Sequence, residues 1–203
     1  MKHRIVPALA LALLIPMVAT AADPAPAPAA VSNYATIEIG DLIAKVAKRT
    51  GKQFVVDPRV RAEVPLIGLT ADQVDYPKLL AILNINLFAT YESGGLVRVG
   101  PDANARQWPI PVTSEVPAKA LDDELVTVML TPKNMCTSQA VPVLRPLMPQ
   151  AAHMAAYPLS NTLILSDRAA NVRRIVEMVE RLDKAAPAGQ RCPESYPAKS
   201  DSK

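Results

Sequence analysis

The stretch 158–183 constrains the fold more than any other part of the chain, because an apolar run is followed there by a long amphipathic pattern. The partly β-branched run 162–165 is bounded by polar turn residues, which is typical of a buried strand. Asp167 or Ser166 can accept hydrogen bonds from the free amides of a helix start. Apolar residues then recur on one helix face, at Val172, Ile175, Val176, Val179 and Leu182. The stretch therefore predicts a surface helix that packs on a sheet.

The first 21 residues have the pattern of a secretory signal peptide. Lys2 and Arg4 precede an apolar run over 5–18, and the small-x-small sequence 19–21 follows it. This run is shorter than the roughly 20 residues that a membrane-spanning helix needs. We therefore expect removal of residues 1–21 and a periplasmic location.

Charge and cysteine content limit the partners that the exported chain can have. Removal of residues 1–21 takes two of the 22 basic residues and none of the 19 acidic ones, so the mature chain is close to neutral. A polyanionic partner is therefore not indicated. In an oxidising compartment Cys136 and Cys192 predict a disulfide, whereas in the cytosol the same pair would be two buried thiols.

Proline-rich segments divide the mature chain into two small domains. We expect an Ala/Pro-rich tether at 22–33, a first domain at 34–100, a linker at 101–121, a second domain at 122–184 and a flexible tail at 185–203. Each domain is long enough for a small sheet and two helices, so the fold class that we predict is α+β, with two small sandwich domains.

The first domain has the predicted order βαββαββ. The elements that we expect are a strand at 35–39, a helix at 40–49, a buried strand at 53–57, a strand at 63–69, a helix at 76–88 and a hairpin at 89–99. Pro65 cannot donate to a ladder, which makes its strand an edge or places a bulge there. Gly94 and Gly95 supply the positive φ that a hairpin turn needs.

The second domain has the predicted order βαββα. Its elements are a strand at 124–130, a helix at 138–148, strands at 153–157 and 162–165, and the helix that ends near 184. Both Pro142 and Pro146 should destabilise this helix: Pro142 costs little if it lies in the opening turn, and Pro146 predicts a kink. The pattern is that of a two-layer sandwich.

The sequence offers no constellation for catalysis, for a cofactor or for a metal. The acidic cluster 122–124 has no opposing acid that the sequence can place beside it, so an acid/base pair is not indicated. His153 is the only histidine after the signal peptide, and two cysteines alone do not make a metal site. We therefore predict a protein that is not an enzyme.

Separated motifs resemble the periplasmic N-domains of secretins, the outer-membrane ring proteins of type II secretion and type IV pili. The segment GKQFVVDPRV at 51–60 resembles the first such domain. LRPL at 144–147, followed by YPLSNTLI at 157–164, resembles the second. The resemblance implies a signalling-type fold shared with TonB-dependent receptors for the first domain and a KH-like fold for the second. Only 185–203 follow the last expected helix, so we expect no pore from this chain alone.

A KH-like fold raises nucleic acid as a partner. Nucleic-acid KH modules clamp the backbone with a GXXG loop, and there is no glycine between positions 122 and 184. We therefore expect no nucleic-acid binding.

The resemblance implies partners within a secretion machine, either an inner-membrane partner protein or the secretin ring, and it is compatible with a homo-oligomer. We expect pairing along exposed strand edges, with Thr36, Glu38 and Pro65 as candidate contact residues. The alternatives are a periplasmic scaffold or signalling adaptor unrelated to secretion, a truncated secretin remnant, and an enzyme of unknown type.

Overall fold

The computed structural model describes residues 34–189, 191 and 192. They lie in a compact unit that begins at Tyr34. The expected signal peptide and tether at 1–33, and the expected tail beyond Cys192, lie outside these residues.

The first part of the unit has the predicted order of elements. They are β1 (Thr36–Glu38), α1 (Ile39–Thr50), β2 (Gln53–Val56), β3 (Glu63–Pro65), a short 3-10 turn (Ala71–Gln73), α2 (Tyr76–Ile85), β4 (Phe88–Ser93) and β5 (Leu96–Pro101). β1 and β3 form an antiparallel pair, and β2, β5 and β4 form a three-stranded sheet in that order, with β2 parallel to β5. The hairpin between β4 and β5 turns at Gly94 and Gly95, both with positive φ, as predicted.

Helix α1 packs its apolar stripe into the first core. Leu42, Ile43 and Val46 are buried there, together with residues of α2. Ile39 was expected in a strand, but it is the first residue of the helix. The reason is that the Glu38 side chain accepts a hydrogen bond from the Gly40 amide and caps the helix, which therefore begins one residue earlier than expected.

Three expectations for the first domain were wrong. The strand at 53–57 is not buried: Val55 is 47% exposed and Val56 is 36% exposed, because β2 is an edge strand. The strand that contains Pro65 ends there instead of continuing to Leu69. Helix α2 ends at Ile85 instead of continuing to residue 88, and Leu87, within the expected helix, is 68% exposed with a φ of 61°.

The segment expected to be a linker, 101–121, contains regular structure. A 3-10 helix (Asp102–Gln107) follows β5, and β6 (Val112–Thr113) pairs in parallel with β7. The segment therefore contributes an edge strand to the second sheet, and proline content alone did not show this.

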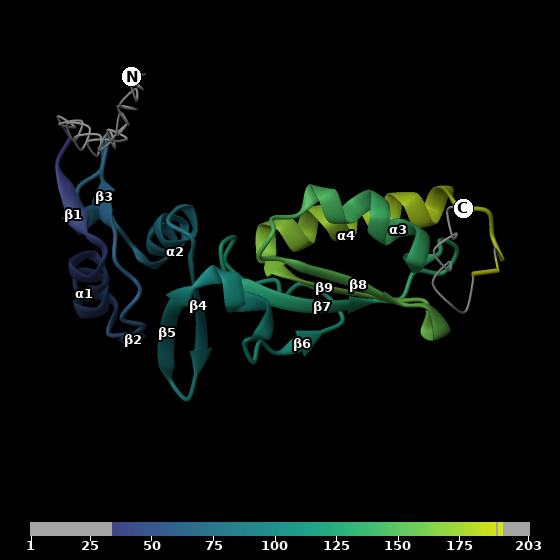
Figure 1. Ribbon diagram of the computed structural model, residues 1–203, viewed down its shortest axis with the longest axis horizontal. Coiled ribbons are helices and arrows are strands. Elements are labelled where there is room, and N and C mark those ends of the chain that lie inside the picture. Colours follow the sequence, from purple (N-terminus) through teal and green to yellow (C-terminus); the bar gives the residue numbers. More distant parts are fainter. Residues whose placement is uncertain (1–33, 190, 193–203) are drawn as a thin grey trace, which may run out of the picture. The chain divides into compact units, whose positions relative to one another are not determined.

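The second domain is a two-layer sandwich, as predicted. It contains β7 (Leu125–Leu130), α3 (Thr137–Leu144), a 3-10 turn (Arg145–Leu147), β8 (His153–Tyr157), a second 3-10 turn (Pro158–Ser160), β9 (Thr162–Arg168) and α4 (Ala169–Ala185). The sheet order is β6-β7-β9-β8, and α3 and α4 cover one of its faces (Figure 1). The core lies between the two layers and includes Val128, Leu144, Leu163, Leu165 and Ile175.

The ends of the helices differ from the predictions. Neither Asp167 nor Ser166 caps α4; the amides of Ala169 and Ala170 instead donate to the carbonyls of Glu124 and Asp122. Backbone from the loop before β7 thus replaces the expected side-chain cap. Leu182, which the apolar spacing placed on the packing face of its helix, is exposed, and so is Leu147 at the end of the helix expected at 138–148.

Prolines shape α3 differently from the prediction. Pro142 lies inside α3 rather than in its opening turn, and Pro146 lies in the 3-10 turn after the helix has ended. The kink expected at Pro146 is therefore a change of helix type.

No helix among residues 34–189, 191 and 192 combines the length and apolar content needed to cross a bilayer.

Candidate interaction site

The β1–β3 ribbon brings together the three residues that sequence reasoning singled out. Thr36 is opposite Pro65, Ile37 is opposite Val64, and Glu38 is opposite Glu63. Val64 is buried and Ile37 packs against the first core, so the ribbon is attached to the domain along one face.

Hydrogen bonds show which backbone groups of β1 face outward. The Leu66 amide donates to the Ala35 carbonyl at 3.2 Å, and the Ile39 amide donates to the Ala62 carbonyl at 2.9 Å. Residues of an antiparallel pair alternate between facing the partner strand and facing away from it. Positions 35, 37 and 39 therefore face β3, whereas the amide and carbonyl of Thr36 and the amide of Glu38 face the outer edge. The Glu38 carbonyl belongs to the N-cap of α1 and accepts the first hydrogen bond of that helix.

The two outer edges of the ribbon are not equivalent. By the same alternation, the backbone groups of Glu63 and Pro65 face the outer edge of β3. Pro65 has no amide hydrogen there, so an added strand would lose a hydrogen bond on that side. The outer edge of β1 retains its donors at Thr36 and Glu38 and is the better template for another strand.

Charge is concentrated at one end of the ribbon. Glu38 and Glu63 are directly opposite in the register. Like charges at opposed positions of a sheet are destabilising. The Glu38 carboxylate is partly compensated by the amide of Gly40, and Glu63 is exposed. This end of the ribbon therefore favours a cationic neighbour.

A disulfide joins Cys136 and Cys192, as the sequence predicted, across a separation of 56 residues. Cys136 is buried and immediately precedes α3. The bond therefore attaches the segment that follows α4 to the N-terminal end of α3.

The Asp183 carboxylate organises the loop before Cys136. It accepts hydrogen bonds from the amides of Lys133 at 3.1 Å, Asn134 at 2.6 Å and Met135 at 2.8 Å. Partial burial raises the pKa of Asp183, but donation by Met135, Asn134 and Lys133 outweighs it and holds the pKa below its ordinary value.

Asn161 holds the other side of the same loop. It has a left-handed backbone conformation with φ of 49°, a state that asparagine tolerates better than most residues. Its amide nitrogen donates to the carbonyls of Pro132 and Met135, and its oxygen accepts from the Thr137 amide and hydroxyl. The sequence predicted only a turn at this position.

The acidic residues 122–124 have structural partners. Asp122 forms an ion pair with Arg173 at 2.8 Å, Asp123 accepts from the Asn84 side chain, and Glu124 accepts from the Leu121 amide. Within the described part of the chain, no group of three or more His, Cys, Asp or Glu side chains is arranged to hold a metal ion.

Comparisons with known proteins agree with the motifs. Residues 32–99 match the family described as GspD-like, N0 domain, and residues 127–188 match the bacterial type II/III secretion system short domain. The chain is 32% identical over 155 residues to secretin XcpQ of Pseudomonas aeruginosa, covering 75% of this chain and 22% of that protein. It is 30% identical over 159 residues to secretin ExeD of Aeromonas hydrophila, covering 76% of this chain and 23% of that protein.

A solved structure shares the fold. The chain is similar to a chain of the Klebsiella pneumoniae type II secretion system outer membrane complex of PulD, PulS and the PulC HR domain, with 28% identity and a TM-score of 0.64. The match covers 75% of this chain and 26% of that one. The chain thus spans about a quarter of the length of the proteins that it matches.

Proposed function

Residues 32–99 and 127–188 are N-terminal domains of the secretin type, and on this premise we propose that the chain is a periplasmic interaction module of a type II secretion machine. It binds another protein of the machine and performs no catalysis. The similar Klebsiella structure contains PulD together with PulS and the PulC HR domain, which supports a partner of this class. The disulfide supports an oxidising compartment.

The observation that carries this proposal is the outward-facing backbone of β1. A partner strand that pairs there uses the amide and carbonyl of Thr36 and the amide of Glu38 and extends the ribbon by one strand. A basic residue of that strand placed near Glu38 and Glu63 would relieve their mutual repulsion. Such a small interface fits an affinity in about the micromolar range.

The test is a proline substitution at Thr36. Thr36→Pro removes an outward amide, and the register places it opposite Pro65, so the inner hydrogen bonds of the ribbon do not depend on it. Thr36→Val keeps the amide and the β-branched shape, which makes it the matched control. The probe is the counterpart of the PulC HR domain encoded by the same organism, titrated by calorimetry against the full chain.

We expect Thr36→Val to bind like wild type and Thr36→Pro to bind about tenfold or more weakly, which corresponds to about 1.4 kcal/mol. Circular dichroism of each variant checks that the fold is retained. Equal binding by a folded Thr36→Pro variant would exclude pairing along β1. Glu38 is unsuitable for this test because it also caps α1.

A further inference from the structure

A second surface lies on the three-stranded sheet, away from the β1–β3 ribbon. A shallow groove there is lined by residues that include Val55, Pro58, Tyr91, Arg98, Gly100 and Trp108. Val55, Arg98 and Tyr91 are directly aligned across β2, β5 and β4, so their side chains share one face of the sheet. The groove therefore crosses all three strands.

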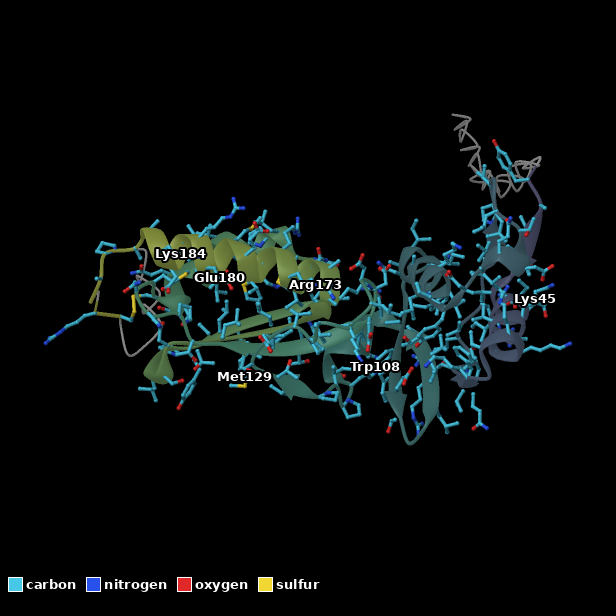
Figure 2. The ribbon with its side chains drawn as sticks, turned by 180° about the vertical axis from the view of Figure 1, so that it is seen from behind. Lys45, Trp108, Met129, Arg173, Glu180 and Lys184 are labelled. Carbon is cyan, nitrogen blue, oxygen red and sulfur yellow. A yellow bond between two sulfur atoms is a disulfide. The ribbon has the colours of Figure 1, made fainter. Side chains whose placement is uncertain are left out.

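Trp108 forms one wall of this groove and lies beside the β4–β5 hairpin (Figure 2). Its ring packs on Tyr91 with centroids 4.9 Å apart. The ring also lies over Gly100, where a Cβ atom would come within 3.3 Å of it. The missing side chain at position 100 thus lets the indole approach the backbone, and Trp108 remains only partly buried.

The opposite wall is apolar and open. Val55 is 47% exposed, on an edge strand that would ordinarily present polar residues to water. Trp, Tyr and Arg are the residues that most often dominate binding energy at protein interfaces. A bulky apolar side chain placed between Val55 and Trp108 would cover both.

The charge on the groove is positive. The Asp57 carboxylate accepts two hydrogen bonds from the Arg59 guanidinium, at 2.9 and 2.8 Å, which lowers the pKa of Asp57 to about 2. Its negative charge is therefore already matched. Arg98 is exposed and lies 6.0 Å from the centre of the Tyr91 ring, a distance at the outer limit of a cation–π contact. The Arg98 guanidinium can donate hydrogen bonds to the carboxylate of a bound peptide.

We propose that this groove binds a peptide segment in which a bulky apolar residue is followed by an acidic one. The apolar side chain lies between Val55 and Trp108, over Gly100, and the carboxylate pairs with Arg98. This site is separate from the β1 edge. Binding of a peptide in the groove does not depend on the function proposed above, so each proposal can fail without the other.

The chain contains a single tryptophan, so the tryptophan emission reports on the surroundings of Trp108. The probes are two capped synthetic peptides that are identical except for one residue, Gly-Ser-Phe-Glu-Ser-Gly and Gly-Ser-Phe-Lys-Ser-Gly, titrated into the full chain. We expect the glutamate peptide to change the Trp108 emission saturably and to bind about tenfold more tightly than the lysine peptide.

Two variants test the assignment of roles. Arg98→Glu should make the lysine peptide bind more tightly than the glutamate peptide, because the charge at position 98 is inverted. Val55→Ser should weaken both peptides equally, because it removes apolar contact and leaves the charge unchanged. Thr36→Pro, on the β1 edge, should leave both titrations as in wild type.

Several outcomes overturn the proposal. They are the absence of a saturable change with either peptide up to about 1 mM, equal affinity for both peptides, and an unaltered preference in a folded Arg98→Glu variant. A loss of binding in Thr36→Pro would also overturn it, since the signal would then come from the ribbon.

Discussion

Arg168, the last residue of β9, forms a buried ion pair with Asp102, the first residue after β5, at a distance of 3.5 Å. The same guanidinium donates to the Phe88 carbonyl at 3.2 Å. Arg168 is only 5% exposed. Beside it, Ala89, Ala105 and Leu125 form a small shared core with Trp108 and Ile110. Residues of both expected domains and of the expected linker are therefore packed together at this point.

Removal of Arg168 should destabilise the whole chain. Arg168→Met leaves Asp102 and the Phe88 carbonyl without their partner, and loss of one member of a buried pair typically costs about 3–5 kcal/mol. The double variant Arg168→Met/Asp102→Asn should recover part of this loss, because no uncompensated charge remains. Urea unfolding of the two single variants and the double variant measures the coupling. A coupling near zero would show that the pair contributes nothing.

The fold was largely predictable from the sequence where apolar periodicity was strong. In the stretch 158–183 a short apolar run is followed by apolar residues spaced three and four apart. The run forms β9 and the spaced residues belong to α4, as predicted. Cys136 and Cys192 could be paired because only two cysteines were present.

Features that depend on distant contacts could not be predicted. The cap of α4 comes from carbonyls more than 40 positions earlier in the chain. Val55 is exposed because β2 is an outer strand of its sheet. A run of apolar residues predicts a strand but does not indicate where that strand lies in the sheet. The two residues of β6 are too few for a detectable alternation. The groove around Trp108 was not predicted either, although a tryptophan outside the expected domains was a visible signal.

We predict that each of the two domains folds separately, and the structure suggests where the first one should end. A fragment 34–100 lacks Ala105 and Trp108, which pack against β4, whereas a fragment 34–109 retains them. We expect both to fold, with a higher thermal midpoint for 34–109 by several degrees, since about 1 kcal/mol shifts a domain of this size by roughly 4–8 °C. Thermal melts followed by circular dichroism measure this. Equal midpoints would mean that the packing of Trp108 adds nothing to stability.

Loss of the disulfide should lower stability without unfolding the second domain. Closure of a separation of 56 residues is worth about 4 kcal/mol through the entropy of the unfolded chain. Asp183 and Asn161 hold the loop before Cys136 independently of the bond. The double variant Cys136→Ala/Cys192→Ala should therefore unfold at a lower urea concentration but keep its native circular dichroism. The control is the same measurement with reductant, which should shift wild type and leave the variant unchanged. A variant without native structure would contradict the assigned role of the loop contacts.

Asp183 should make the stability of the chain sensitive to acid. The pKa of this carboxyl is lower in the folded state than its ordinary value, because three backbone amides donate to the ionised form. Its contribution is therefore fully present above the unfolded pKa of about 3.9, and it is lost as the pH falls through the lower folded pKa. Asp183→Asn removes the charge while keeping an oxygen acceptor, so the variant should be less stable than wild type at neutral pH and should converge toward it in acid. Urea midpoints measured from neutral to strongly acidic pH test this. Glu180→Gln, an exposed residue on the same helix (Figure 2), is the matched control and should remain parallel to wild type throughout. If Asp183→Asn also remains parallel to wild type, the amides of this loop do not stabilise the carboxylate.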